Sequence, residues 1–217
     1  MKSTLFTLAL LACAVVSAED WKPLFNADLS NADYNPAVWS VDAQNVLSAN
    51  SDSAIWTHDE YENFELYVEF KTDDHTNSGV VIYCCNKENW IPNSVEIQIN
   101  DDSKAIAEGA APQKSSCGAI YGHVAPSKLL VKKPGEWNTM IIKAVGKNLE
   151  VTLNGEKVSE MDMSLWTSAK KNPDGSDIPA WLSTPFSEIV PKGFVGFQGK
   201  HGKSCIYFRN LKIRPAK

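Results

Sequence analysis

Alternation of apolar and polar residues is the clearest pattern in this chain, and it has the period of a β-strand. Every second side chain is apolar in Phe64–Lys71 and again in Ser94–Asn100. The polar face of the second segment carries Glu96, Gln98 and Asn100. A carboxylate flanked by two amides suits the hydroxyl groups of a sugar, whereas an ordinary solvated strand often carries Lys or Thr there.

Further strands are predicted where apolar, β-branched and aromatic residues lie between Asn, Asp, Ser and Gly turns. Val80–Cys85 is apolar on both faces, which is typical of a strand inside a sheet. Asn154-Gly155 predicts a tight hairpin. The other expected strands cover Trp21–Phe25, Val38–Val41, Val46–Ser48, Ala54–Thr57, Gly118–Tyr121, 134–145, Leu149–Leu153, Lys157–Val158, Phe194–Gln198 and 205–213.

Two long segments break the alternation. Residues 101–116 are polar and rich in Ala and Gly, and we expect a loop that covers a site. Residues 161–192 are irregular, with one or two helical turns expected at Ser164–Lys170. Many short strands without a long amphipathic helix predict one all-β domain, an antiparallel sandwich or jelly roll.

The N-terminus has the pattern of a secretory signal peptide. An apolar run, Leu5–Val16, is too short to span a bilayer and is followed by small residues. We expect cleavage after Ala18, so that residues 1–18 are a signal peptide and 19–217 are the mature domain, periplasmic or secreted. The alternative, a lipoprotein anchored through Cys13, fits less well because its signal would be unusually short.

Charge narrows the classes of partner. The formal net charge is −5, and it becomes −6 without residues 1–18, which contain Lys2 and no acid. A mildly acidic chain without a basic cluster is poorly suited to nucleic acid or anionic lipid. The rest of the sequence contains no apolar run long enough for a transmembrane segment. No pattern indicates an oligomeric state.

Four cysteines remain after cleavage, Cys84, Cys85, Cys117 and Cys205. In an exported protein they predict one or two structural disulfides, for which three pairings exist. A zinc site fits less well, because neither a Cys-x-x-Cys pair nor a matching His spacing accompanies them.

Several familiar catalytic patterns are missing from the sequence. It has no Gly-rich phosphate loop, no Gly-x-Ser-x-Gly elbow and no His-Glu-x-x-His pair. A conventional jelly-roll endoglucanase carries several acids at alternate positions of one strand, whereas the segment around Glu96 carries one acid. The two-carboxylate arrangement for ordinary glycoside hydrolysis is therefore not supplied by this strand.

Ten short blocks, in order along the mature chain, resemble one family. They are Trp56–Leu66, which follows Trp21–Phe25, and then Asn77–Gly79, Glu96–Gln98, Gly118–Tyr121, Gly135–Asn138, Leu153–Gly155, Asn172–Gly175, Gln198–Gly202 and Phe208–Asn210. Together they are similar to the 3-keto-disaccharide hydrolase family, whose domain is also described as a 3-keto-glucoside lyase and hydratase.

This resemblance implies a concanavalin A-like jelly roll of two curved antiparallel sheets. It also implies an exported bacterial enzyme whose substrate is a glycoside or disaccharide already oxidised to a ketone at C3. The ketone acidifies the hydrogen on C2, so a base can remove it and the resulting enolate can expel the C1 substituent. Water can then add to the 2-hydroxy-3-keto-glucal. Such a site needs a base, a group that stabilises the enolate oxygen and help for the leaving group.

Three residues are the candidate catalytic groups. His201 lies in a Gly-flanked turn and is the candidate general base. Glu96 is a candidate base or acid, and Tyr121 could donate to the leaving oxygen, although a Tyr at a strand end often only packs. A divalent metal ion held by Glu96 and His201 is an alternative way to stabilise an enolate.

The candidate substrate-binding residues are amides, aromatic platforms and one cation. Two of them also have a structural interpretation, Arg209 as half of an ion pair and Asn77 as a turn former before Gly79. A non-catalytic carbohydrate-binding module on the same scaffold is the competing function, but it has little use for a proton-transferring pair. The set is Gln98, Asn100, Gln198, Trp90, Trp166, Arg209 and Asn77.

Overall fold

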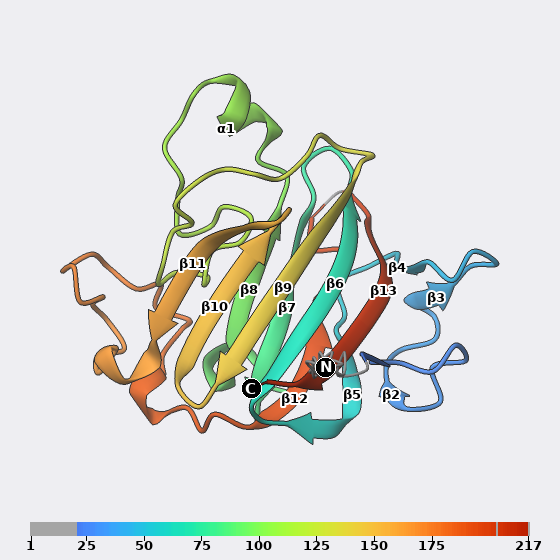
Figure 1. Ribbon diagram of the computed structural model, residues 1–217, viewed down its shortest axis with the longest axis horizontal. Coiled ribbons are helices and arrows are strands. Elements are labelled where there is room, and N and C mark those ends of the chain that lie inside the picture. Colours follow the sequence, from blue (N-terminus) through green and yellow to red (C-terminus); the bar gives the residue numbers. More distant parts are fainter. Residues whose placement is uncertain (1–20, 203, 217) are drawn as a thin grey trace, which may run out of the picture.

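Two antiparallel sheets stacked face to face make up the molecule (Figure 1). The computed structural model describes residues 21–202 and 204–216, and the predicted signal peptide lies outside them. Sheet A has the strand order β11 (Glu156–Asp162), β10 (Asn148–Leu153), β9 (Trp137–Val145), β6 (Phe64–Thr72), β13 (Ile206–Pro215), β4 (Leu47–Ala49), β3 (Trp39–Val41), and β1 (Lys22–Pro23) also pairs with β13. Sheet B has the order β2 (Ala32–Asp33), β5 (Ile55–Tyr61), β12 (Gly193–Phe197), β7 (Asn77–Cys84), β8 (Val95–Asn100).

The observed architecture confirms the predicted fold class, an all-β jelly-roll sandwich. The clearest strand of the sequence, β6, lies in the middle of sheet A between β9 and β13. As predicted, β7 is an interior strand of sheet B, and Asn154-Gly155 turns β10 into β11.

In the part of the chain that the structure describes, helices are few and short. They are the α-helix α1 (Ser103–Ala107) and the 3-10 helices η1 (Ile91–Asn93), η2 (Met163–Leu165) and η3 (Phe186–Glu188). Figure 1 shows α1 in the green loop above the sheets, within the segment expected to be a long loop. Across residues 21–202 and 204–216, no helix has the length and apolar character needed to span a bilayer.

The core fills the space between the sheets. The inward side chains of β6 follow the predicted alternation, and Phe64, Leu66, Val68 and Phe70 are at most 2% exposed. Sheet B contributes to the same core the equally buried inward residues of β8, which are Val95, Ile97 and Ile99. Because one face of β8 is fixed in this core, its other face must point away from the sandwich.

Two local predictions differ from the structure. Gly118–Tyr121 is not a regular strand, although Gly118 and Tyr121 donate backbone hydrogen bonds to Gln98 and Glu96 of β8. The segment turns away after a single bridge between Ile97 and Ile120, so it extends sheet B only locally. The helical turn expected at Ser164–Lys170 is η2, which ends at Leu165.

The expected disulfides are also wrong, since all four cysteines in the described part of the chain are free. Cys117 belongs to the core between the sheets, whereas Cys84 packs in a separate cluster with Trp56 and Val81. Cys85, next to Cys84, is exposed at the end of β7. The thiols therefore lie in different layers of the fold, and packing rather than cross-linking buries Cys84 and Cys117.

Candidate active site

A row of four residues crosses the outer face of sheet B. Glu96 of β8 is paired with Val81 of β7, Val81 with Gly196 of β12, and Gly196 with Trp56 of β5. Residues that lie directly opposite each other in antiparallel strands point to the same face. The candidate acid therefore projects from the solvent side of the sheet, opposite the core.

A cavity of about 260 Å³ lies over this face. Seven of the nine residues that line it are predicted site residues, and they come from separate strands and loops. The lining residues are Asn77, Trp90, Ile91, Glu96, Gln98, Tyr121, Trp181, Gln198 and His201.

The Glu96 side chain lies across the backbone of Gly79. A Cβ atom added to Gly79 would come within 2.2 Å of Glu96 Oε1, so a glycine is required beneath the carboxyl group. Burial raises the pKa of the Glu96 carboxyl to about 8, and the negative charge of Asp52 adds to this rise. At neutral pH Glu96 is therefore mainly a protonated acid, able to donate a hydrogen bond or a proton.

His201 is paired with an acid that the sequence analysis missed. Its Nδ1 atom lies 2.6 Å from Oδ2 of Asp52, and both side chains are about half exposed, at 53% and 52%. The two loops are tied together because Lys200 donates its backbone N–H to Ser51 at 3.0 Å. His201 also forms a β-bridge with Asn77 at the start of β7. With Nδ1 directed at Asp52, Nε2 is the ring nitrogen left for a substrate.

Gln98 is a fixed polar group in the cavity floor. It is only 3% exposed, and its Nε2 donates to Asn77 Oδ1 at 2.8 Å, to Ser78 O at 3.2 Å and to Ile99 O at 3.1 Å. Because three acceptors hold the amide nitrogen, the amide orientation is set. The carbonyl oxygen of Gln98 is then an acceptor for a substrate hydroxyl.

Tyr121 lies next to Glu96 at the edge of sheet B, where its backbone N–H donates to Glu96 O at 2.9 Å. Burial raises the pKa of the Tyr121 hydroxyl, the charge of Glu96 raises it further, and a polar contact with Trp181 opposes the rise. The hydroxyl therefore keeps its proton at neutral pH and can act as a donor.

Aromatic side chains form two walls of the cavity. Trp90 packs edge-on against Trp56, with 6.2 Å between ring centroids. Trp181 lies on the other side, beside Tyr121, and is 57% exposed. Trp181 and Ile91 were not predicted. Trp181 lies in the irregular segment 161–192, where no alternation shows which side chains point toward the sheet.

Three predicted substrate-binding residues lie outside this cavity. Asn100 shares the polar face of β8, but its Nδ2 donates to Asp102 Oδ1 at 2.7 Å, which turns it toward the next loop. Trp166 donates from its indole N–H to Asn172 Oδ1 at 2.8 Å and lines a groove beside β10 and β11 of sheet A.

Arg209 is the third residue outside the cavity. It forms an ion pair, which was the structural alternative to substrate binding. Its Nε donates to Glu69 Oε2 at 2.6 Å, and its guanidinium group lies 3.9 Å from the centroid of the Trp137 ring. Both partners belong to strands of sheet A, whereas the cavity lies on sheet B. Its predicted role at the enolate oxygen therefore has no support in the geometry.

The donor set does not fit the predicted metal ion. In the described part of the chain, no group of three or more His, Cys, Asp or Glu side chains is arranged to hold one. His201 and Glu96 line the cavity together, but Nδ1 of His201 is directed at Asp52. A stable divalent site needs more ligands than these residues offer.

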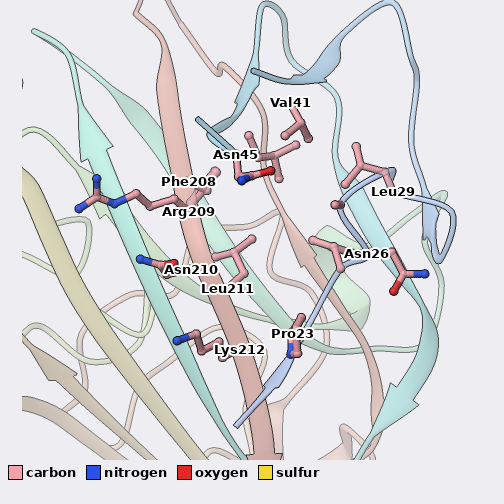
Figure 2. A pocket seen from close by; sticks show the side chains of 13 residues that line it. Pro23, Asn26, Leu29, Val41, Asn45, Phe208, Arg209, Asn210, Leu211 and Lys212 are labelled. Carbon is pink, nitrogen blue, oxygen red and sulfur yellow. The ribbon is translucent and has the colours of Figure 1, made fainter. Parts of the chain in front are cut away.

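A second cavity, of about 350 Å³, lies beside β13 and has a different character. Figure 2 shows Leu29, Val41 and Leu211 converging on it, while the side chains of Arg209 and Lys212 point away. It has no titratable side chain directed inward, so it lacks the groups needed for proton transfer.

Comparison with known proteins agrees with a carbohydrate-active site. The family model for the 3-keto-alpha-glucoside-1,2-lyase-like domain matches residues 20–214. The chain is 60% identical to a proposed glycosyl hydrolase from Parabacteroides distasonis ATCC 8503, with a TM-score of 0.85 over 90% of this chain and 98% of that one. A search of curated proteins gave no match.

More distant structures share the fold alone. A second proposed glycosyl hydrolase from Parabacteroides distasonis ATCC 8503 is 23% identical, with a TM-score of 0.72 over 92% of this chain and 95% of that one. The carbohydrate binding module CBM66 from Bacillus subtilis is 8% identical, with a TM-score of 0.54 over 88% of this chain and 99% of that one.

Proposed function

Because the chain belongs to the 3-keto-alpha-glucoside-1,2-lyase-like family, we propose that it is an exported enzyme that cleaves 3-keto-glycosides by elimination. Family membership and the glycosyl hydrolase-like relative indicate action on carbohydrates. The observation that carries the finer proposal is one cavity that holds a protonated acid, Glu96, and a carboxylate-paired histidine, His201.

The first step is removal of the C2 proton. Nε2 of His201 accepts this proton, and the C–H electron pair moves to form the enolate of the C3 ketone. The Asp52 carboxylate, 2.6 Å from Nδ1, orients the ring and stabilises the imidazolium that forms. Glu96 donates a hydrogen bond to the enolate oxygen, where negative charge develops.

The second step breaks the bond between C1 and the leaving oxygen. The C3 carbonyl re-forms, the electron pair becomes the C1–C2 double bond, and the leaving oxygen takes a proton from Tyr121. The products are a 2-hydroxy-3-keto-glucal and a free alcohol. Addition of water, with hydroxyl on C1 and hydrogen on C2, gives the free 3-keto sugar, so that the overall change is hydrolysis.

This chemistry accounts for the single acid of β8. Ordinary glycoside hydrolysis passes through an oxocarbenium-like transition state and uses two carboxyl groups on either side of the bond. Elimination next to a ketone instead creates negative charge on oxygen. One neutral acid and one base are then sufficient on this face, and a second carboxylate beside Glu96 on β8 would place negative charge directly against the enolate.

The test is the release of alcohol from a 3-keto-glucoside compared with its unoxidised parent. We expect release from the oxidised compound only, and Glu96→Ala and His201→Ala should each abolish it. Release from the parent alone would refute elimination. Sugar binding without release from either compound would instead favour a carbohydrate-binding module.

Export is part of the same proposal. Residues 1–18 are proposed as the signal peptide and 19–217 as one mature domain in the periplasm or outside the cell. N-terminal sequencing of the exported protein should find Glu19 first. A lipid-modified Cys13 at the N-terminus would support the lipoprotein alternative.

A further inference from the structure

The cavity is closed on one side by buried aromatic residues. The Trp56 ring lies flat over Gly196, since a Cβ atom added there would be 2.2 Å from Trp56 Cε3. Trp56, Val81 and Cys84 form a buried cluster, against which Trp90 and Phe194 pack. The row that begins at Glu96 therefore ends in a filled apolar wall, and a substrate cannot extend across the sheet in that direction.

The opposite side of the cavity, beside Tyr121, carries the exposed side chain of Trp181. The described part of the chain has five large apolar side chains with high exposure, and two of them line this cavity, Trp181 at 57% and Ile91 at 39%. Burying an exposed Trp face against a ligand is favourable in free energy. An aromatic side chain that lines a cavity together with polar groups is suited to binding a ligand there.

The position of Trp181 is fixed by the turn that carries it. Leu182 is buried, and its backbone N–H donates to Pro179 at 2.9 Å. Leu182 packs directly on Gly122, where an added Cβ atom would lie 2.6 Å from Leu182 Cδ1. The turn that carries Trp181 is thus anchored to the segment that follows Tyr121, which reduces the cost of ordering this turn when a ligand binds.

We propose that Trp181 binds the leaving group of the substrate and selects leaving groups with a flat apolar face, such as an aryl group or a pyranose ring. This inference rests on the proposed elimination. Trp181 contacts Tyr121, the residue assigned to protonate the leaving oxygen, and both lie on the open side of the cavity. The oxidised ring is then bound against the filled wall, and the group attached to C1 extends over the indole.

The kinetic test uses two substrates that differ only in the leaving group, 4-nitrophenyl and methyl 3-keto-glucoside. Trp181→Ala should lower kcat/KM for the aryl substrate about tenfold and change that for the methyl substrate less than about twofold. Leu165→Ala removes an apolar side chain that is 63% exposed outside the cavity, and it should change neither value. An equal loss for both substrates in Trp181→Ala would overturn the proposal.

A binding measurement separates failure of this inference from failure of the proposed reaction. Calorimetry with the unoxidised 4-nitrophenyl and methyl glucosides requires no turnover. The wild-type protein should bind the aryl compound more tightly, and Trp181→Ala should remove that preference while Leu165→Ala retains it. A preference unchanged in Trp181→Ala would overturn the assignment, whether or not 3-keto-glucosides are cleaved.

Discussion

The Nδ1 atom of His201 lies 2.6 Å from Oδ2 of Asp52, although 149 positions separate the two residues in the sequence. The loop after β12 and the loop after β4 meet at the edge of the cavity, where Lys200 is hydrogen-bonded to Ser51. The pair fixes which nitrogen of His201 faces a substrate. It turns an exposed histidine into an oriented base.

Removing the Asp52 carboxylate should therefore impair chemistry more than binding. We expect Asp52→Ala to lower kcat about 100-fold with little change in KM, because His201 loses its orientation and the stabilisation of its protonated form. Steady-state kinetics on a 3-keto-glucoside measure both values. Asp59→Ala, an exposed acid of β5 outside the cavity, is the matched control. A rise in KM of similar size, with a normal kcat, would mean that Asp52 binds the substrate instead.

Gly79 should be essential for the placement of Glu96. In Gly79→Ala the new Cβ atom would lie 2.2 Å from Glu96 Oε1, so the carboxyl group must move. A displacement of about 1 Å at a reacting group can cost about 100-fold in rate. The side chain of Glu96 can rotate away, so we expect a folded protein with a low kcat.

The comparison variant is Gly109→Ala, where an added Cβ atom meets no neighbour within 4 Å. It should keep full activity despite the cost of a side chain at positive φ. Near-normal turnover in Gly79→Ala, with circular dichroism like that of the wild type, would show that the position of Glu96 is not critical.

The raised pKa of Glu96 predicts how stability depends on pH. Its pKa is about 8 in the folded protein against 4.5 for the free side chain. Below about pH 4.5 both states are protonated and the group has no effect on the free energy of unfolding. As the pH rises toward 8 the unfolded state ionises first, so the wild type loses stability relative to a neutral isostere.

At pH 8 the free energy of unfolding of Glu96→Gln should consequently exceed that of the wild type by on the order of 2–4 kcal/mol, and its melting temperature should be higher. Near pH 4 the two proteins should melt at the same temperature. Thermal unfolding across this range measures the difference. A difference that grows toward low pH would mean that Glu96 is ionised in the folded protein.

Chelation should leave the activity intact, because the described donor groups do not form a divalent site and the proposed steps use only side chains. Turnover of a 3-keto-glucoside after exhaustive EDTA treatment should match the untreated rate. Loss of activity that returns on addition of a divalent metal would restore the metal hypothesis for Glu96 and His201.

Local patterns were sufficient to predict most of the strands and the floor of the cavity. The alternation in β8 placed Glu96 and Gln98 on one face, because the period of a strand is fixed by backbone geometry. Arg209 and Trp166 could not be placed in this way. Arg209 could have bound substrate or formed an ion pair, and Trp166 could have contacted a sugar or packed within the fold. Only contacts between segments that are distant in the sequence decide between these roles.

The rest of the site depends on contacts between distant loops. Asp52 lies among several Asn, Asp and Ser residues of a turn, and nothing local distinguishes it from them. Trp181 lies in a segment without periodicity. The disulfide prediction failed for a related reason, since the number of cysteines says nothing about which layer each thiol occupies.

The fate of a C2 deuterium tests the central claim most directly. A 3-keto-glucoside labelled with deuterium at C2 is turned over in ordinary water and the products are followed by NMR, with an enzyme-free sample to correct for spontaneous exchange. Our account predicts a slower reaction than with the unlabelled substrate and a product that has lost the deuterium to solvent. A product that retains deuterium at C2, formed at the same rate as from unlabelled substrate, would contradict elimination through an enolate.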